Sequence, residues 1–195
     1  MQRENRPEKC PDCMLFKSIC ICSKIKKFDL RTKITLLMHI REINKTTNTG
    51  KLAKLMLNNC GIAILGRKDI ELQPEELIFK DHTNLILFPA ASNELNEKFL
   101  STLEKPINLI VLDGNYHQAV KMTRSELLRD IKRVRLPYGQ KSSYELRTAR
   151  DSEKISTIEA IIKAIEIIEN GPVVKEMEKI FLKMIDDIKT KMGSC

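Results

Sequence analysis

The chain has 195 residues, 42% of them hydrophobic and 31% charged, which is typical of a folded globular protein and excludes a disordered or fibrous one. No apolar run approaches the roughly 20 residues of a membrane span, and the polar N-terminus lacks the apolar core of a signal peptide, so we expect a cytoplasmic protein. The net charge of +8 favours an anionic partner, although charge alone does not separate nucleic acid from an anionic membrane or from a merely solvated surface.

Residues 1–30 are expected to form a small metal-binding segment ahead of a larger domain over residues 31–195. The segment contains four cysteines with the spacing C-x-x-C-x6-C-x-C, namely Cys10, Cys13, Cys20 and Cys22. Four thiolates complete the tetrahedral shell of a structural zinc ion, and the short spacers let all four converge without a large fold. A reactive or incidental thiol cluster is the alternative, and a reducing cytoplasm argues against disulfides. The spacing therefore predicts a structural zinc site.

Four short apolar runs predict the strands of a sheet. They are too short for helices and lack the polar alternation of a strand with one solvated face, so they are typical of a parallel sheet buried on both sides. The runs are residues 34–38, 62–65, 85–88 and 109–112.

Helical patterns lie between these runs. Residues 50–59 predict a helix with Thr49 as its N-cap and Gly61 as its stop, and Cys60 is expected in the core on the apolar face of that helix. Residues 93–103 carry apolar side chains at helical spacing and predict a second helix. The alternation of strands and helices predicts an α/β fold with right-handed crossovers.

The last third of the chain is predicted to be helical. Ser156 and Glu159 form a capping-box pattern at the start of one helix, which Gly171 is expected to end. Pro172 is expected to start a last helix, whose apolar stripe is predicted to pack in the core. The fold class is thus α/β, a mostly parallel sheet flanked by helices, with an N-terminal zinc segment and C-terminal helices.

Four further segments occur in a distinctive order. They are His39–Glu42 followed by Asn48–Ala53, then Leu87–Ala90, then Leu112–Tyr116, and finally Ser143–Arg147 leading to Ile155–Ala160. Together with the N-terminal cysteines, their order and spacing resemble the DTW-domain family of tRNA-uridine aminocarboxypropyltransferases. The resemblance covers the chain from Cys10 to about Glu169. One departure is clear: the family's Asp-x-Thr-Trp motif is Asp113-Gly114-Asn115-Tyr116 here, and the chain contains no tryptophan.

The resemblance implies a fold related to the knotted α/β methyltransferases of the SPOUT class. It also implies S-adenosylmethionine as the donor, tRNA as the partner rather than a membrane, and 3-(3-amino-3-carboxypropyl)uridine as the product. An RNA methyltransferase with the same fold and donor is one alternative. A zinc-bearing RNA-binding protein without catalysis is the other, and only the Asn115-Tyr116 departure favours it.

The candidate site residues lie mainly where predicted strands end, which is where ligands bind in parallel α/β sheets. Asp113 is the catalytic candidate, expected to accept or orient the proton of uridine N3, with a helix cap or a contact to the donor's amino group as alternatives. The donor-binding candidates are Phe88, Pro89, Ala90, Leu112, Gly114, Asn115, Ser156, Thr157 and Glu159. The substrate-binding candidates are His39, Glu42, Asn48, Thr49, Tyr116, Tyr144 and Arg147. Basic side chains expected to contact phosphates are Lys24, Lys26, Lys27, Arg41, Lys45 and Lys51.

Overall fold

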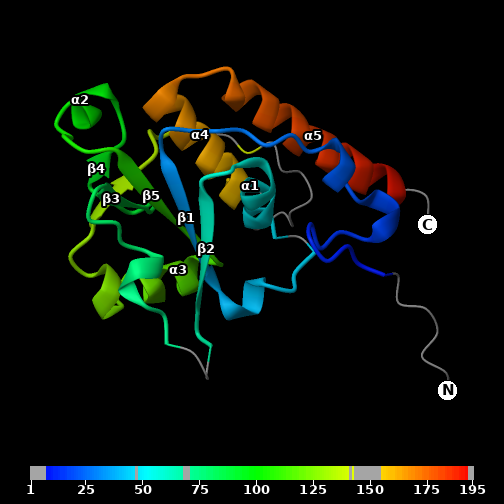
Figure 1. The fold of residues 1–195 in the computed structure, drawn as a ribbon, viewed down its shortest axis with the longest axis horizontal. Coiled ribbons are helices and arrows are strands. Elements are labelled where there is room, and N and C mark those ends of the chain that lie inside the picture. The colour runs from blue at the N-terminus through cyan, green and yellow to red at the C-terminus, as the bar shows by residue number, and fades with distance from the viewer. Residues whose placement is uncertain (1–7, 47, 68–70, 141, 143–154, 193–195) are drawn as a thin grey trace.

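A six-stranded parallel sheet organises the molecule, in a computed structural model that describes residues 8–46, 48–67, 71–140, 142 and 155–192 (Figure 1). The strands are β1 (Lys33–His39), β2 (Cys60–Leu65), β3 (Thr83–Leu87), β4 (Asn93–Glu94), β5 (Ile107–Asp113) and β6 (Lys132–Arg135). Their spatial order is β2-β1-β5-β3-β6-β4, and every pairing among the described strands is parallel. The predicted parallel α/β fold is therefore confirmed.

Helices cover both faces of this sheet. They are α1 (Gly50–Met56), α2 (Glu97–Leu100), α3 (Tyr116–Met122), α4 (Thr157–Glu169) and α5 (Val173–Met192). One hydrophobic core joins α1, α4 and α5 to one face of the sheet, and a smaller core joins α3 to the opposite face. The strand β5 lies in the middle, and all seven of its residues are buried because apolar layers cover it on both sides.

The four predicted strands are confirmed, but two helix predictions need correction. The helix predicted over residues 50–59 ends at Met56, and Cys60 begins β2 instead of lying on a helix, although its side chain is buried as expected. Gly61, the predicted stop, lies within β2. The helix predicted over 93–103 is the short strand β4 followed by the four-residue α2, because the side chain of Asn96 accepts the backbone N–H of Phe99 and starts the helix there.

The C-terminal helices follow the sequence pattern closely. Ser156 is the N-cap of α4, and Glu159 completes the capping box, as predicted. The helix ends one residue earlier than expected, because Asn170 takes the left-handed conformation that Gly171 was predicted to supply. The apolar stripe of α5 is in the core, as predicted, and Met177 and Phe181 are fully buried.

The cysteine-bearing segment packs directly on the body of the molecule. Leu15 and Ile21 are each 2% exposed and belong to the same hydrophobic core as α1, α4 and α5. The Nζ of Lys24 lies 2.9 Å from Oδ2 of Asp187 on α5, which ties the segment to that helix. The division at residue 30 stays a prediction. Among the described residues, no helix has the length and apolar character to cross a membrane.

Candidate ligand site at the carboxyl edge of the sheet

The connectivity of the sheet makes the carboxyl ends of its central strands the expected place for a ligand. The chain leaves β1 toward β2 on one side and leaves β5 toward β6 on the other side. In parallel α/β sheets, ligands bind where the connections diverge in this way, outside the carboxyl ends of the strands. Two candidate residues end neighbouring strands at this point, His39 on β1 and Asp113 on β5.

Asp113 is the centre of a buried hydrogen-bond network. Its side chain is 3% exposed. The amide Nδ2 of Asn48 donates to Oδ2 at 2.6 Å, and the hydroxyl of Thr157 donates to Oδ1 at 2.7 Å. Asn48 precedes α1 and Thr157 is the first residue of α4, so the carboxylate joins three segments that are far apart in the sequence. Three of the predicted site residues are thus brought into direct contact.

Among the described residues, no cationic side chain is hydrogen-bonded to this carboxylate. Burial raises the pKa of Asp113, and the hydrogen bonds from Asn48 and Thr157 oppose that shift only in part. The charge of Lys51 lowers the pKa of Asp113, but the ammonium group of Lys51 donates its hydrogen bond to the carbonyl oxygen of Ile43. Burial in turn lowers the pKa of Lys51. The site therefore holds a carboxyl group whose protonation is unusually sensitive to its surroundings.

Gly50, which sequence reasoning did not place among the site residues, makes this arrangement possible. A Cβ atom at this position would lie 2.7 Å from Oδ2 of Asp113 and 2.9 Å from its Cγ, closer than any real contact. Only a residue without a side chain lets the start of α1 rest on the carboxylate. The glycine was visible in the sequence, but its role depends on a contact between segments 63 residues apart, which no local pattern signals.

The N-terminus of α4 meets the start of α1 above this carboxylate. Thr49 is the N-cap residue of α1, as predicted, but its hydroxyl does not cap that helix and instead accepts the backbone N–H of Ile158 on α4 at 3.4 Å. Glu159 accepts the backbone N–H of Ser156 at 2.6 Å and the hydroxyl of Ser142 at 2.9 Å. The contact from Ser142 was not foreseen. Ser156 and Glu159 are buried, which fits a structural capping role for both.

On the other side of Asp113, a second polar cluster joins β1 to α3. Asn115 is the N-cap of α3 and forms a capping box with Gln118, and the Nε2 of Gln118 lies 3.3 Å from Nδ1 of His39. The same ring nitrogen accepts the backbone N–H of Arg41 at 3.1 Å. Burial lowers the pKa of His39, so the neutral imidazole is favoured. Gln118 was not predicted as a site residue, although its spacing from Asn115 is that of a capping box.

The remaining candidates are arranged around these two clusters. Glu42 is buried and pairs with Lys45, whose Nζ lies 2.6 Å from its Oε1. The rings of Phe88 and Tyr116 are nearly parallel, with an interplanar angle of 13° and 6.3 Å between their centroids, and Tyr116 is 48% exposed.

Of the other donor-binding candidates, Leu112 is buried, Gly114 is half-buried, and Pro89 and Ala90 are exposed in the turn after β3. The candidates Tyr144 and Arg147 lie outside the described residues.

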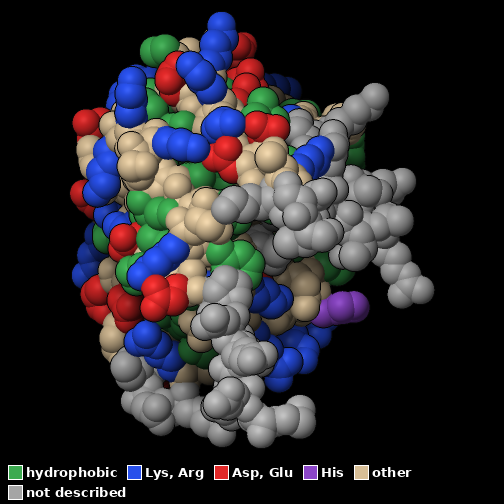
Figure 2. All heavy atoms as spheres, turned by 90° about the vertical axis from the view of Figure 1, so that its right-hand side faces the viewer, with side chains coloured by type: hydrophobic (Ala, Val, Ile, Leu, Met, Phe, Trp, Pro, Cys, Tyr) green, Lys and Arg blue, Asp and Glu red, His purple; other side chains and the backbone are tan. Residues whose placement is uncertain are grey.

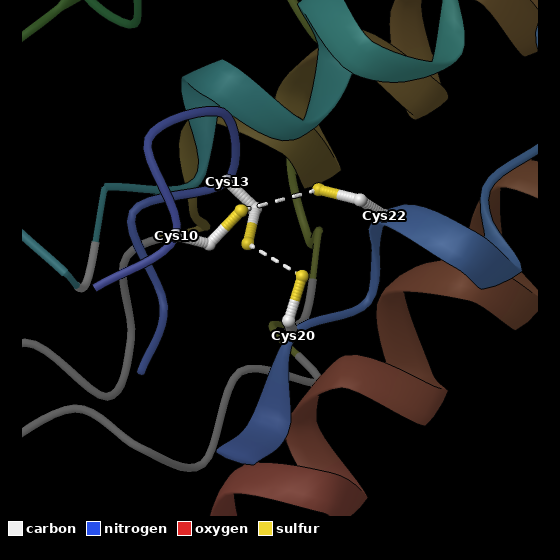
Figure 3. Close-up of side chains that lie close together, drawn as sticks. All are labelled: Cys10, Cys13, Cys20 and Cys22. Atoms are coloured by element: carbon white, nitrogen blue, oxygen red, sulfur yellow. Dashed lines mark hydrogen bonds between the residues drawn. The ribbon is translucent and has the colours of Figure 1, made fainter. Parts of the chain in front are cut away.

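The side chains of the four N-terminal cysteines point toward one another and form a compact cluster (Figure 3). The four sulfur atoms, from Cys10, Cys13, Cys20 and Cys22, all lie within 4.8 Å of one another. Two of the sulfur–sulfur distances are 3.7 and 3.8 Å. A tetrahedron with metal–sulfur bonds of about 2.3 Å has edges of about 3.8 Å. The donor set and its spacing therefore fit a four-coordinate thiophilic metal ion.

The backbone around the first two cysteines supports the same conclusion. Backbone N–H groups of Cys13 and Asp12 donate to the thiol sulfur of Cys10 and lower its pKa to about 7, whereas burial raises the pKa of Cys13. The hydrogen bonds to Cys10 favour the thiolate form in which a cysteine binds a metal. Met14 takes the left-handed conformation, with φ of 62°, and its N–H donates to the carbonyl oxygen of Cys10 at 2.9 Å. This tight turn brings Cys10 and Cys13 to the same side of the loop.

The fold and these two clusters describe a parallel α/β protein with a candidate ligand site at the carboxyl edge of its sheet and, near the N-terminus, four cysteines that could hold a metal ion. The model of the DTW domain family matches residues 7–189, which is nearly the whole chain, and the chain belongs to this family. No solved structure matches the chain significantly.

Two curated relatives carry the name tRNA-uridine aminocarboxypropyltransferase 2. The protein from Macaca fascicularis is 29% identical over 180 residues, and the one from Mus musculus is 28% identical over 181 residues. Each alignment covers 89% of this chain but only 60% of the relative, so the chain spans about three fifths of the length of these proteins.

Proposed function

We propose that this protein transfers the 3-amino-3-carboxypropyl group of S-adenosylmethionine to N3 of a uridine in tRNA. The membership in the DTW domain family and the names of the two relatives support this reaction. The single structural observation that supports it best is the buried carboxyl group of Asp113, which lies at the point of the sheet where a ligand would bind. The reaction produces methylthioadenosine, whereas the competing methyltransferase reaction would produce S-adenosylhomocysteine.

The reaction requires that the proton on N3 of uridine is removed and that one carbon of the donor is placed in line with N3. The donor's sulfonium makes the adjacent carbon of the methionine side chain electrophilic. N3 of uridine loses its proton, its lone pair forms the new N–C bond, and the C–S electron pair leaves with methylthioadenosine. The enzyme selects this carbon rather than the methyl group by position, so the chief task of the site is to hold two ligands in register.

Asp113 is suited to the proton-handling part of this task. A carboxylate has about four lone-pair positions, and Asn48 and Thr157 occupy two of them, so each oxygen retains a site for a further donor. That donor is the N3–H of uridine in our proposal. Because burial raises the pKa of Asp113, the carboxylate is a stronger base than an exposed aspartate. Asn48 and Thr157 then act as positioning residues that fix the direction of the carboxylate.

The four cysteines are proposed to bind zinc with a structural role. The donor set of four sulfurs leaves no open position for a substrate, as expected of a structural rather than a catalytic zinc site. The protein purified under reducing, chelator-free conditions is expected to contain about one zinc per chain by elemental analysis. A metal-free preparation that keeps its full unfolding free energy would contradict this proposal, because structural zinc stabilises the segment that it closes.

Asp113→Asn tests the catalytic proposal. If Asp113 handles the N3 proton, calorimetric affinity for S-adenosylmethionine should stay within a few-fold, while single-turnover transfer to tRNA falls by two or more powers of ten. If Asp113 binds the donor instead, affinity and rate should fall together. A variant with the wild-type rate would remove Asp113 from the mechanism. Identification of the nucleoside by-product in the wild-type reaction separates aminocarboxypropyl transfer from methyl transfer and from no reaction.

The tRNA partner is proposed from the relatives' names and the net charge of +8. On the face shown in Figure 2, Lys and Arg side chains are spread among Asp and Glu side chains rather than gathered in one stripe. Lys24, one of the predicted phosphate contacts, pairs with Asp187. Affinity for tRNA is expected to fall steeply as salt rises, and Lys26→Ala with Lys27→Ala should reduce the slope if these two bind phosphates. A slope that is unchanged in this variant would place the phosphate contacts elsewhere.

A further inference from the structure

Tyr138 is the most exposed large hydrophobic side chain in the part of the chain that the structure describes, at 82%. It follows β6 in the turn Pro137-Tyr138-Gly139, and Gly139 takes a φ of 81°, a conformation that glycine adopts without strain. A tyrosine this exposed contributes little to the core, because almost none of its apolar surface is removed from water. The turn therefore presents an aromatic ring to the solvent at the carboxyl edge of the sheet.

One face of the Tyr138 ring packs against a guanidinium group. The Cζ atom of Arg135 lies 3.8 Å from the centroid of the Tyr138 ring. Arg135 is itself fixed: its Nη1 donates to Oε2 of Glu94 at 2.7 Å and to the carbonyl oxygen of Leu136 at 3.2 Å, and its side chain is only 13% exposed. An arginine that is largely covered and paired, under an exposed ring, makes a rigid platform with one open face.

This platform lies on the same edge of the sheet as the candidate site. In the order β5-β3-β6, the strand that precedes Tyr138 is two positions from the strand that ends in Asp113. Neighbouring strands are about 4.8 Å apart, so the ends of β5 and β6 are about 10 Å apart across the sheet. Phe88 lies in between, at the end of β3, and stacks on Tyr116. Aromatic rings thus follow three neighbouring strands on the edge where Asp113 lies.

We propose that Tyr138 is a stacking site for an unpaired RNA base that neighbours the modified uridine. This inference rests on the proposed function for the identity of the RNA. Proteins that recognise unpaired RNA stack its bases on aromatic side chains and on arginine planes, and both groups are present here in one preformed stack. The base binds the open face of the ring, on the same edge of the sheet as Asp113.

The test compares Tyr138→Ala with Tyr138→Phe. Because a phenylalanine ring stacks as a tyrosine ring does, Tyr138→Phe should bind tRNA like the wild type, whereas Tyr138→Ala should bind roughly 5- to 100-fold more weakly. The KM for tRNA should rise by a similar factor in the alanine variant, with affinity for S-adenosylmethionine unchanged. Leu182→Ala on α5, which removes another exposed apolar side chain, is the matched control and should change neither quantity.

The dependence on salt sharpens this test. Stacking involves no counterion release, so the ratio of the two dissociation constants, wild type to Tyr138→Ala, should stay constant as salt rises. An equal loss of tRNA affinity in Tyr138→Phe, or no loss of tRNA affinity in Tyr138→Ala, would overturn the proposal that Tyr138 stacks on a base.

The same measurements with a short unpaired oligoribonucleotide separate the two proposals. If the wild type transfers no aminocarboxypropyl group but Tyr138→Ala still weakens oligonucleotide binding, the proposed function fails and the stacking site stands. If the wild type is active and the alanine variant binds and reacts normally, only the stacking site fails.

Discussion

The two ends of β5 hold buried polar networks of opposite character. Asn108, near the start of the strand, is 0% exposed, and Asp113, at its end, is 3% exposed. Because side chains alternate along a strand, the two residues lie on opposite faces of the sheet. One network is built from neutral groups, and the other surrounds a carboxylate.

The neutral network satisfies every group of its central amide. The side-chain Oδ1 of Asn108 accepts the hydroxyl of Thr35 at 2.7 Å, and its Nδ2 donates to the backbone carbonyl oxygen of Leu77 and to Oδ1 of Asn84, both at 2.8 Å. Asn84 extends the network to the backbone of Phe79 at 2.9 Å. These contacts fasten the segment before β3 to the sheet, which is a structural task that needs no charge.

The network at Asp113 has neutral donors, yet it contains an acid. A buried carboxylate without a bonded cation reduces the free energy of unfolding, because the charged form has lost its hydration. An asparagine would hold the same segments together without this cost, as Asn108 does at the other end. The comparison therefore supports the proposed role of Asp113 in catalysis.

The largest effect on the difference between the two networks is expected from Asn108→Asp. The new carboxylate can still accept from Thr35, but it cannot donate to Leu77 or to Asn84, and it is buried without a cation. The free energy of unfolding in urea at pH 7 is expected to fall by about 3 kcal/mol or more. Asp113→Asn is the control, which should not be destabilised by a comparable amount. Equal losses in both variants would mean that the two networks are alike.

The second-largest effect is expected in the pH dependence of the free energy of unfolding, which should differ between the networks at the two ends of β5. The folded pKa of Asp113 is raised above its ordinary value of 3.8, so its contribution to stability is present below that value and is lost as pH rises toward the folded pKa. Asp113→Asn lacks this loss. The unfolding free energy of the variant minus that of the wild type should therefore increase with pH above about 4, by at most about 1.4 kcal/mol per pH unit. A difference that is flat in pH would show that folding does not change the ionisation of Asp113.

The smallest expected effect comes from a matched pair of hydroxyl deletions. Thr157→Val removes a donor to Asp113 and Thr35→Val a donor to Asn108, and each should lower the free energy of unfolding by about 1 kcal/mol. Only Thr157→Val should also move the pH profile of transfer to higher pH, because the hydrogen bond from Thr157 lowers the pKa of Asp113. A shift with both variants, or with neither, would contradict the separation of the two networks.

The sequence predicts the centre of the fold better than its edges. The strands β1, β2, β3 and β5 are apolar runs that both faces of the sheet bury, and hydrophobicity reveals them directly. β6 has the sequence Lys-Arg-Val-Arg with only Val134 buried, so its place in the sheet depends on neighbours rather than on its own composition. Cys60 shows the same limit, because an apolar residue between a helix and a strand fits the core in either element.

The sequence predicts many residues of the candidate site, but it does not predict which of them contact one another. Asp113, Asn48 and Thr157 each follow a local signal, namely a strand end, a loop or a capping box. That all three meet at one carboxylate results from the strand order, which brings β1 beside β5 and α4 above them. Gly50 was missed for the same reason, and so was the contact of Gln118 with His39, although the capping box of Gln118 with Asn115 is a local signal.

The closeness of Gly50 to Asp113 also limits the order in which these two positions can change during evolution. An alanine at position 50 would place its Cβ atom 2.7 Å from Oδ2 of Asp113, so this substitution alone forces the carboxylate or α1 to move. A smaller residue at position 113 would remove the obstacle. A lineage that loses the acid can therefore accept side chains at position 50 afterwards, whereas the reverse order passes through a strained intermediate. Once such a side chain is in place, restoring the acid alone would recreate the clash, so the loss would be difficult to reverse.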